Sequence, residues 1–478
     1  MRKIGFGKIV CIVAIFCVAT AVVSPAQTLT TLTNFTFADG DVPDIALVQG
    51  VNGNLYGTTL AGGSSVSCLS AGGAPNGCGT FFEITPGGAL TVLHVFDGTD
   101  GQIPYGLVQL PNGSFYGIAF EGGVNNRGSV FKINPTGAVT TLYSFCSQPN
   151  CADGSFPGTL VLATNGNLYG TTVTDGANAR GTVFQMTPSG TLTTLYSFCS
   201  VGGVGNCTDG ADPSGLIQAK DGSLYGTTTS GGANYAGSIF RITLTGKMTT
   251  LYSFSGTDGQ DPGGLLQATS GNFYGLARSG AMAGTVFEMT PAGVLTTLYN
   301  FCSQKNCGDG SYPNGLMQAT NGNFYGTTAN GGLWGNWGTI FQITPKGALT
   351  TLHRFCSQTN CADGALPQAG LMLDTDGTFY GVTSGSTYGT IFSLSSGISP
   401  FVEALPNFGR AGRVVGILGT DLTGTTGVSF NGTPATTFTV LSPTAIKVTV
   451  PSGATTGTIQ VTTPKGTLKS NLVFKVVP

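Results

Sequence analysis

A short phrase that contains Tyr-Gly recurs seven times along the chain. In its fullest form it reads Asn-Gly-Asn-Leu-Tyr-Gly-Thr-Thr, over residues 165–172. Its tyrosines are Tyr56, Tyr116, Tyr169, Tyr225, Tyr274, Tyr325 and Tyr380, so that consecutive copies lie 49 to 60 residues apart. Such a period indicates supersecondary units that stack on one another, because one unit alone cannot bury its apolar face.

Each unit contains four short runs that are rich in β-branched and aromatic residues. In one complete unit these runs are residues 215–219, 224–228, 238–243 and 248–254, separated by Asp-Gly and other glycine-containing turns. Runs of this length and composition predict strands. Four strands in about 50 residues are typical of one blade of a β-propeller.

The number of strand runs predicts how the array closes. The first three runs each occur seven times, but the fourth follows its own unit only six times, because the last unit stops at residues 391–394. The missing copy is found near the other end of the chain, over residues 29–35. We therefore predict an all-β chain in which residues 27–396 form a seven-bladed β-propeller closed by an N-terminal outer strand, which leaves no open sheet edge.

The composition supports this fold class and excludes others. Only 8 % of the residues are charged, and the chain contains 77 glycines. Long amphipathic helices and coiled coils need many more charges, and nucleic-acid-binding domains need a basic surface. Turns between many short strands explain the glycines, and we expect no nucleic-acid partner.

The repeat ends near residue 396, and the remaining chain has a different pattern. Alternating runs over residues 414–418, 427–430, 445–450, 458–462 and 472–477 predict short strands. We interpret residues 397–478 as a second domain, a small immunoglobulin-like β-sandwich.

One motif, Asp-Gly-x-x-Pro, follows every outer strand. A ring of calcium sites is one interpretation of seven identical carboxylates, and an Asx-type turn with glycine at positive φ is the other. A motif present in every unit serves the architecture rather than a single reaction, so we favour a structural turn. Its aspartates are Asp39, Asp100, Asp153, Asp209, Asp258, Asp309 and Asp363.

Ten of the twelve cysteines form five pairs that are close in sequence. No histidine or further cysteine accompanies any pair, whereas a zinc site needs about four ligands. We therefore predict disulfides in an oxidising compartment, and neither a metal site nor a cofactor. The pairs are Cys68/Cys78, Cys146/Cys151, Cys199/Cys207, Cys302/Cys307 and Cys356/Cys361.

The first 26 residues carry an export signal. Arg2, Lys3 and Lys8 precede an apolar run over residues 9–23, and Ser24-Pro25-Ala26 resembles a cleavage site. This run is short for a membrane span and has the organisation of a signal peptide. We expect cleavage after Ala26, no transmembrane segment after cleavage, and a location in the medium, at the cell surface or in the periplasm.

Two resemblances agree with these domain predictions. Residues 165–172 and the segment Gly-Thr-Val-Phe-Gln-Met-Thr-Pro-Ser-Gly over residues 181–190 resemble the GloVer tandem repeat of secreted bacterial proteins. This resemblance covers residues 28–396 and implies export, but it implies no activity. The tail resembles the IPT/TIG immunoglobulin-like fold, whose members are spacer, adhesion or dimerisation modules. The matching residues are Ile398, Ser399, Pro400, Gly419, Val428, Ser429, Phe430, Asn431, Gly432, Val450, Pro451, Gly457 and Val461.

Candidate binding residues fall in the loops that join the second strand to the third and each unit to the next. These loops are long and varied, and variable loops on a repeated scaffold are where function concentrates. Trp334 and Trp337 are suited to stacking on sugar rings, although they can equally well cover their own blade. The candidates are Trp334, Trp337, Asn336, Tyr235, Tyr388, Arg127, Arg180 and Arg278.

No catalytic residues are assigned. His94 and His353 replace the tyrosine of an outer strand, and we interpret them as substitutions at a blade position. The candidates for a pair of catalytic carboxylates are Glu121, Asp175, Asp374 and Asp376.

The sequence thus favours a non-enzymatic recognition or scaffolding protein with a glycan or a surface protein as partner. A carbohydrate-active hydrolase or lyase that uses carboxylates at the propeller mouth, and a purely structural surface or matrix protein, are the alternatives.

Overall fold

The computed structural model describes residues 27–65, 67–68, 76–203, 205–333, 335–385 and 387–478. The predicted signal peptide and Trp334 lie outside the described residues. The described chain is all-β, and its helical residues are confined to three short 3₁₀ turns: η1 (Pro149–Cys151), η2 (Lys305–Cys307) and η3 (Thr359–Cys361).

Most of the strands form four-stranded antiparallel sheets, seven of them within the described residues up to Leu394. We number these sheets as units along the chain. Unit 1 comprises β2 (Val48–Gln49), β3 (Leu55–Thr58), β4 (Thr80–Ile84) and β5 (Leu90–Val95). Unit 2 comprises β6 (Gln102–Gln109), β7 (Phe115–Glu121), β8 (Ser129–Ile133) and β9 (Val139–Ser144). Unit 3 comprises β10 (Ser155–Leu162), β11 (Leu168–Thr174), β12 (Thr182–Met186) and β13 (Leu192–Ser197).

The remaining four units repeat this order. Unit 4 comprises β14 (Ala211–Gln218), β15 (Leu224–Ser230), β16 (Ser238–Ile242) and β17 (Met248–Ser253). Unit 5 comprises β18 (Gln260–Gln267), β19 (Phe273–Ser279), β20 (Thr285–Met289) and β21 (Leu295–Asn300). Unit 6 comprises β22 (Ser311–Gln318), β23 (Phe324–Asn330), β24 (Thr339–Ile343) and β25 (Leu349–Arg354). Unit 7 comprises β26 (Met372–Leu373), β27 (Phe379–Thr383), β28 (Thr390–Leu394) and the N-terminal strand β1 (Leu29–Asn34).

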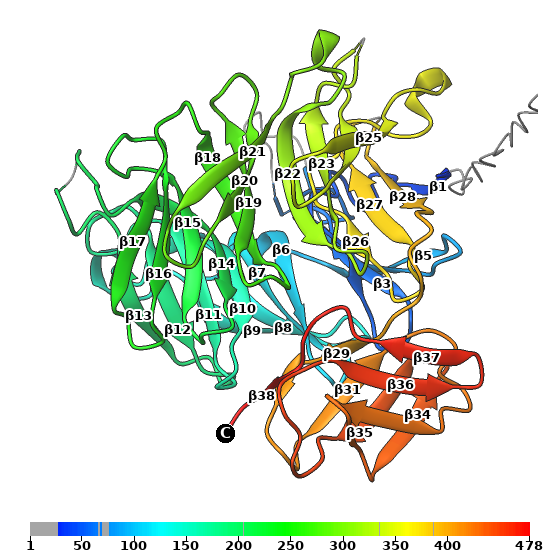
Figure 1. Cartoon of the computed structure of the whole chain (residues 1–478). Helices are drawn as coiled ribbons and strands as arrows, with labels where there is room; N and C mark the ends of the chain where they lie inside the picture. The colour runs from blue at the N-terminus through cyan, green and yellow to red at the C-terminus, as the bar shows by residue number, and fades with distance from the viewer. Residues whose placement is uncertain (1–26, 66, 69–75, 204, 334, 386) are drawn as a thin grey trace, which may run out of the picture.

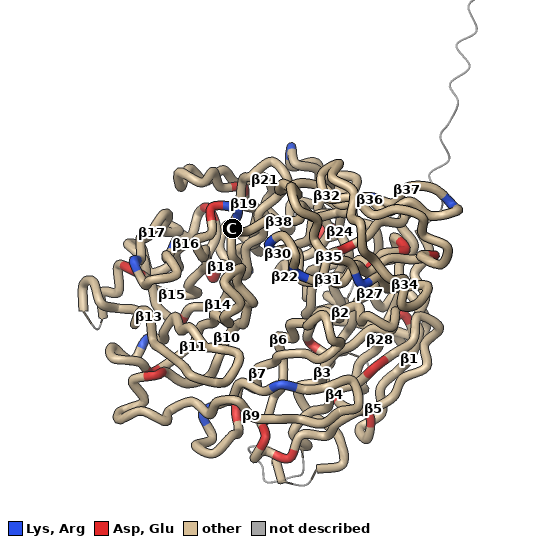
Figure 2. Tube along the Cα trace, turned by 90° about the horizontal axis from the view of Figure 1, so that it is seen from below, with Lys and Arg blue, Asp and Glu red and all other residues tan. Residues whose placement is uncertain are grey.

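The units lie side by side around a common axis (Figures 1 and 2). Strand β1 pairs antiparallel with β28, with Leu29 opposite Leu394 and Asn34 opposite Thr390. The last sheet therefore contains strands from both ends of the repeat region. This pairing gives β28 a partner on its outer edge, which would otherwise be exposed.

Packing between sheets explains the glycine of the repeated Tyr-Gly phrase. The ring of Phe184 lies against Gly170, where a Cβ atom would come within 2.4 Å of the phenylalanine ring. The same ring meets Phe145 of the preceding unit with its centroid 5.3 Å away. A larger residue at position 170 would displace this buried ring. The glycine of the phrase is therefore needed for the packing of Phe184 between the units.

Six of the seven aspartates of the Asp-Gly-x-x-Pro motif hydrogen-bond to the outer strand that precedes them, and Asp39 bonds to Thr36, just after β1. Tyr143 donates from its hydroxyl to Oδ2 of Asp153 at 2.8 Å, and the backbone N–H of Ser147 donates to the same oxygen at 3.0 Å. His353 takes the place of the tyrosine in unit 6, and its Nε2 lies 3.0 Å from Oδ2 of Asp363. These carboxylates thus accept hydrogen bonds from N–H groups of the turn and from side chains of the outer strand before it.

The five predicted cysteine pairs are disulfide-bonded. Four of them close loops between Phe and Asp-Gly-x-x-Pro that are longer than the corresponding loops of the other units. The bonds join Cys68 to Cys78, Cys146 to Cys151, Cys199 to Cys207, Cys302 to Cys307 and Cys356 to Cys361. Such bonds fit an exported protein, because they persist in oxidising compartments.

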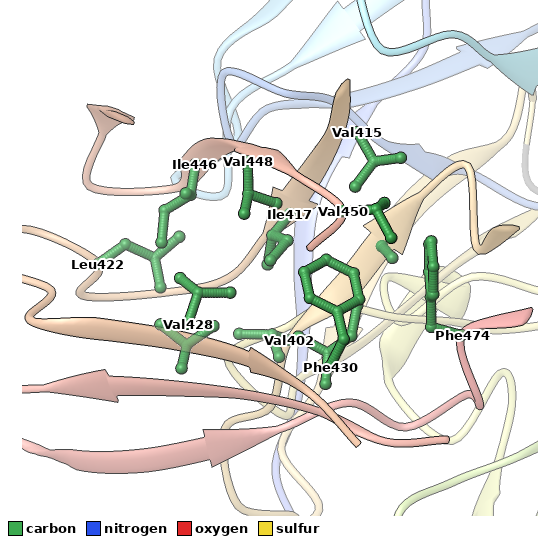
Figure 3. Packing of buried hydrophobic residues seen from close by; sticks show 13 residues of the cluster. Val402, Val415, Ile417, Leu422, Val428, Phe430, Ile446, Val448, Val450 and Phe474 are labelled. Carbon is green, nitrogen blue, oxygen red and sulfur yellow. The ribbon is translucent and has the colours of Figure 1, made fainter. Parts of the chain in front are cut away.

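The C-terminal segment forms two packed sheets. The first comprises β29 (Glu403–Leu405), β31 (Val414–Leu418), β35 (Ala445–Thr449) and β34 (Phe438–Ser442). The second comprises β33 (Thr433–Pro434), β32 (Gly427–Phe430), β36 (Ile459–Thr463) and β37 (Gly466–Lys469). Figure 3 shows the apolar core between them, in which Ile417, Phe430 and Val448 are buried.

Several details of this segment differ from the sequence prediction, among them β29 and β37, which were not expected. The strand expected over residues 472–477 is reduced to β38 (Lys475–Val476), which pairs parallel with β30 (Phe408–Gly409). Strand β34 was not predicted, because its alternating residues face a half-buried surface and the burial contrast along it is weak.

Candidate functional site

The two ends of the ring differ in the length of their loops. Five-residue turns, such as residues 163–167 between β10 and β11, occupy one end, which we call the tight-turn face. The connections from the second to the third strand of each unit, and from each unit to the next, occupy the other end, which we call the long-loop face. Antiparallel pairing requires this division, since alternate connections of a sheet lie at opposite ends.

The C-terminal segment packs on the tight-turn face (Figure 1). Asn471 donates from its amide to the carbonyl of Gln318 at 3.2 Å, and Lys475 Nζ donates to the carbonyl of Lys220 at 3.1 Å. Cavities of 400 and 560 Å³ remain between this segment and the ring of sheets. Their walls are mainly apolar, and Glu403 lines the smaller one, where burial raises the pKa of its carboxyl.

Exposed apolar side chains gather on the long-loop face. Of the twelve large apolar side chains that are exposed in the described part of the chain, seven lie in these loops or at the strand ends beside them. Three are aromatic: Tyr235 is 59 % exposed, Tyr312 48 % and Trp337 38 %. The other four are Val124, Val201, Met282 and Leu333.

Consecutive units meet at this face through a glycine and a proline. A Cβ atom on Gly128 would come within 2.4 Å of Cδ of Pro157 in the next unit, and one on Gly389 within 2.5 Å of Cδ of Pro43. The second contact joins unit 7 to unit 1. We call these contacts seams, and their glycines are Gly79, Gly128, Gly181, Gly237, Gly284, Gly338 and Gly389.

The residue before each seam proline has a left-handed backbone. Its φ lies between +55° and +57° in all seven units, although none of these residues is glycine. At six seams its N–H donates to the carbonyl of the residue before the seam glycine, as from Phe156 to Arg127 at 2.9 Å and from Leu366 to Trp337 at 2.8 Å. We call the seven pre-proline residues the seam ring: Val42, Ile103, Phe156, Asp212, Asp261, Tyr312 and Leu366.

Four of the eight residues nominated from sequence occupy one position of the repeat. Arg127, Arg180, Trp337 and Tyr388 each precede a seam glycine. The Arg127 guanidinium lies over the Phe156 ring, 5.3 Å from its centroid, and Arg180 lies 3.9 Å from a carboxylate oxygen of Asp212. Tyr388 is partly buried and packs edge-on against Phe37.

The other nominated residues have different surroundings. The hydroxyl of Tyr235 donates to Oδ1 of Asn206 at 3.3 Å, and Oδ1 of Asn336 accepts a hydrogen bond from the backbone N–H of Gly331 at 2.6 Å. Asn336 therefore shapes its own loop. Trp334, which we expected to act together with Trp337, lies outside the described residues.

Arg278 belongs to a group of charges that sequence reasoning missed. Burial raises the pKa of Asp44 to about 6 and also raises that of Asp261, and the nearby Arg278 guanidinium offsets part of each shift. Oδ1 of Asp44 is buried without a hydrogen-bond partner in the described structure. Because Asp44 belongs to unit 1 and Asp261 to unit 5, no local sequence pattern connects them.

The four carboxylates proposed for catalysis are divided between the two faces. Glu121 ends β7 and Asp175 follows β11, both on the long-loop face, whereas Asp374 and Asp376 lie in a tight turn between β26 and β27. Asp374 is 4 % exposed, and burial together with the neighbouring Asp376 raises its pKa to about 7. The structure does not bring these four groups to one site.

The described residues contain neither a metal site nor a membrane-spanning helix. No group of three or more His, Cys, Asp or Glu side chains among them is placed to hold a metal ion. Within the same residues, no helix has the length and apolar character needed to cross a bilayer.

Comparisons with solved structures show a propeller-like fold. Streptogramin B lyase superimposes with a TM-score of 0.51 at 16 % identity, over 77 % of this chain and 97 % of that one. A fungal alcohol oxidase of the AA5 family, in complex with copper, has a TM-score of 0.49 at 13 % identity and covers 94 % and 99 % of the two chains. At 16 % identity, the likeness to the lyase speaks for the fold alone.

Comparisons of sequence identify the family. No curated protein matches the chain. The model of the Gloeobacter/Verrucomicrobia repeat matches residues 66–281 and 205–392. Since these two matches together span more than half of the chain, the protein belongs to the Gloeobacter/Verrucomicrobia repeat family.

Proposed function

We propose that residues 27–396 form a seven-bladed β-propeller, closed by β1, and that residues 397–478 form an immunoglobulin-like domain of the IPT/TIG kind. The seven sheets, the pairing of β1 with β28 and the two-sheet core of the C-terminal segment support this assignment. We further propose that the protein is exported after removal of residues 1–26. The five disulfides support an oxidising destination.

The function that we propose is recognition of a glycan, without catalysis, through the long-loop face. The observation that carries this proposal is the gathering of exposed apolar side chains on that face, including Tyr235, Tyr312 and Trp337. Exposed apolar groups in such number mark an interaction surface. Aromatic faces suit the apolar faces of sugar rings, and the polar loop residues around them supply hydrogen bonds.

The charges of this face favour a ligand without net charge. The carboxylate of Asp212 lies near Arg180, and those of Asp44 and Asp261 lie near Arg278. These three carboxylates thus have a cation nearby, so this part of the long-loop face presents hydrogen-bonding groups rather than a field of one sign. A neutral oligosaccharide fits this balance better than a polyanion does.

Glycan-array binding tests this proposal. The mature protein from Gln27 onward would be compared with a variant carrying Tyr312→Ala and Trp337→Ala. Val294→Ala serves as the control, since Val294 is also exposed but lies in a tight turn between β20 and β21. We expect the double variant to lose binding and the control to retain it. Absence of binding by the unsubstituted protein to any glycan would overturn the proposal and favour a scaffold that binds proteins or itself.

A second candidate is a carbohydrate-active hydrolase or lyase that uses carboxylates at the mouth. The observation in its favour is Asp44, whose Oδ1 is unpartnered and whose pKa of about 6 suits a general acid. Release of reducing ends from a bound glycan, abolished by Asp44→Asn with binding retained, would establish this activity. Binding without any turnover would exclude it for that glycan.

A further inference from the structure

We infer that the seam ring supplies the specificity-determining contacts of the long-loop face, with each unit presenting one side chain of it to a neutral sugar ligand. This inference rests on the proposed glycan-binding function. It goes further, because it assigns the selection of ligand to seven residues related by the repeat rather than to the most exposed aromatic groups.

The first argument is backbone strain. A φ near +55° costs energy for residues other than glycine, most of all for β-branched side chains such as Val42 and Ile103. The chain contains 77 glycines, and every seam has a glycine on the preceding unit. None of the seven seam-ring residues, however, is a glycine. Side chains are therefore retained where glycine would relieve the strain.

The second argument is that these side chains lie outside the buried core. Six of the seven are half-buried, and Tyr312 is 48 % exposed. The apolar core of the units is formed by other residues, such as Tyr169, Phe184 and Phe198. Strain that the core does not require is typical of functional positions.

The third argument is that the backbone of the ring is held rigidly. The N–H of Tyr312 donates to the carbonyl of Ala283 at 2.9 Å, and Pro313 packs on Gly284 of the preceding unit. Different side chains therefore project from one repeated geometry. A preorganised frame with variable side chains gives specificity at a low entropic cost.

The order of side chains around the ring indicates how a sugar is held. Asp212, Asp261, Tyr312 and Leu366 belong to four consecutive units, 4 to 7, so that two carboxylates adjoin an aromatic and apolar arc. Carboxylate oxygens accept hydrogen bonds from hydroxyl groups, and the Tyr312 ring offers a stacking face. A pyranose that lies on the apolar arc can therefore direct hydroxyls toward the acidic arc.

Thermal denaturation of single variants tests the strain argument without any ligand. Tyr312→Gly and Tyr312→Asn both relieve the left-handed backbone, and the asparagine variant does so without adding freedom to the unfolded chain. We expect Tm to stay unchanged or to rise by about 1–2 °C. Thr193→Gly is the control, since Thr193 is exposed on β13 with an ordinary backbone, and we expect it to lower Tm. A fall in Tm for both Tyr312 variants as large as that of the control would overturn the inference.

Binding to arrayed neutral oligosaccharides then tests specificity. Tyr312→Asn and Asp261→Asn are each expected to weaken binding at least about tenfold or to change which glycans are bound, as loss of one stacking or charged contact does. Unchanged affinity and unchanged preference in both variants would overturn the inference although glycans bind. If the unsubstituted protein binds no glycan while both Tyr312 variants keep or raise Tm, the sugar is rejected as ligand and the seam ring is supported as a contact surface.

Discussion

Gln49 of unit 1 and Thr375 of unit 7 hold each other through two hydrogen bonds. The N–H of Thr375 donates to Oε1 of Gln49 at 3.3 Å, and Nε2 of Gln49 donates to the Thr375 hydroxyl at 2.9 Å. The same glutamine recurs in later units: Oε1 of Gln218 accepts from the N–H of Thr164 at 2.8 Å, and that of Gln267 from Lys220 at 2.7 Å. Each bond joins a unit to the one before it.

Units 3 and 7 lack this glutamine, with Leu162 and Leu373 at its position, and in unit 3 the neighbouring unit explains why. Unit 3 has Leu162 at the position, and the residue of unit 2 that would supply the N–H is Pro111, which has none. A glutamine side chain at position 162 would find no backbone N–H to accept from at this contact between units 2 and 3.

We predict that Gln49→Leu destabilises the ring. The substitution removes both hydrogen bonds between Gln49 and Thr375, which together contribute about 1–3 kcal/mol to the unfolding free energy. Urea denaturation followed by tryptophan fluorescence measures the loss. Leu162→Met is the control at the equivalent position and is expected to change stability by less than about 1.5 kcal/mol. Equal stability of Gln49→Leu and the unsubstituted protein would contradict a structural role for this bond.

The pH dependence of stability should depend on His353. Burial lowers the pKa of this imidazole below its ordinary value, and Asp363 only partly opposes the shift. The folded protein therefore binds a proton less readily than the unfolded chain does, so the stability that the neutral ring contributes is present above about pH 6.5 and is lost as the pH falls.

His353→Tyr should remove this part of the pH dependence. Tyrosine occupies the same position in unit 5, where Tyr299 donates to Oδ2 of Asp309 at 2.8 Å. We expect the Tm of the variant, relative to that of the unsubstituted protein, to be higher at pH 5 than at pH 8. Parallel Tm curves from pH 5 to pH 8 would show that His353 does not control the acid sensitivity.

Asp374 should have the opposite effect on the pH dependence of stability. Its pKa of about 7 in the folded protein exceeds the ordinary value of 3.8, so the stability present below about pH 4 is lost as the pH rises through 7. Asp374→Asn keeps an oxygen that can accept from the N–H of Thr375 and removes the charge. The variant should be more stable than the unsubstituted protein by about 2–4 kcal/mol at pH 8.5 and equal to it near pH 4.

Urea denaturation at the two pH values measures this difference. Asp376→Asn is the matched control, because Asp376 lies in the same turn but is exposed. It should give only a small stabilisation, through the lost repulsion of Asp374. A gain for Asp374→Asn that is the same at pH 4 and pH 8.5 would show that relief of a buried charge is not its cause.

Loss of a short disulfide should cost little. The combined substitution of Cys146→Ser and Cys151→Ser opens a loop of six residues, which the chain-entropy estimate values at about 2 kcal/mol. Asp153 still accepts hydrogen bonds from the N–H groups of Ser147 and Gln148, so the turn retains its shape. Thermal unfolding should show one transition at a lower Tm. Loss of all cooperative unfolding would mean that the disulfide is required for folding and is more than a local staple.

Local patterns in the sequence predicted the strands of the units closely. The runs expected over residues 224–228 and 238–243 correspond to β15 and β16, and the run over residues 29–35 corresponds to β1, which pairs with β28. These features depend on alternation, turn residues and repeat length, all of which act over a few neighbouring residues. The cysteine pairs were predictable for the same reason, because their partners are close in the chain.

The contacts on the long-loop face were decided only by the tertiary structure. The glycine and the proline of each seam are visible in the sequence, but their pairing across units, and the left-handed residue beside the proline, arise when neighbouring sheets pack. Asp44, Asp261 and Arg278 come together from units 1 and 5, more than 200 residues apart. Periodicity determines which residues form a sheet, whereas the angle and distance between sheets determine which side chains meet, and that geometry exists only once the ring has closed.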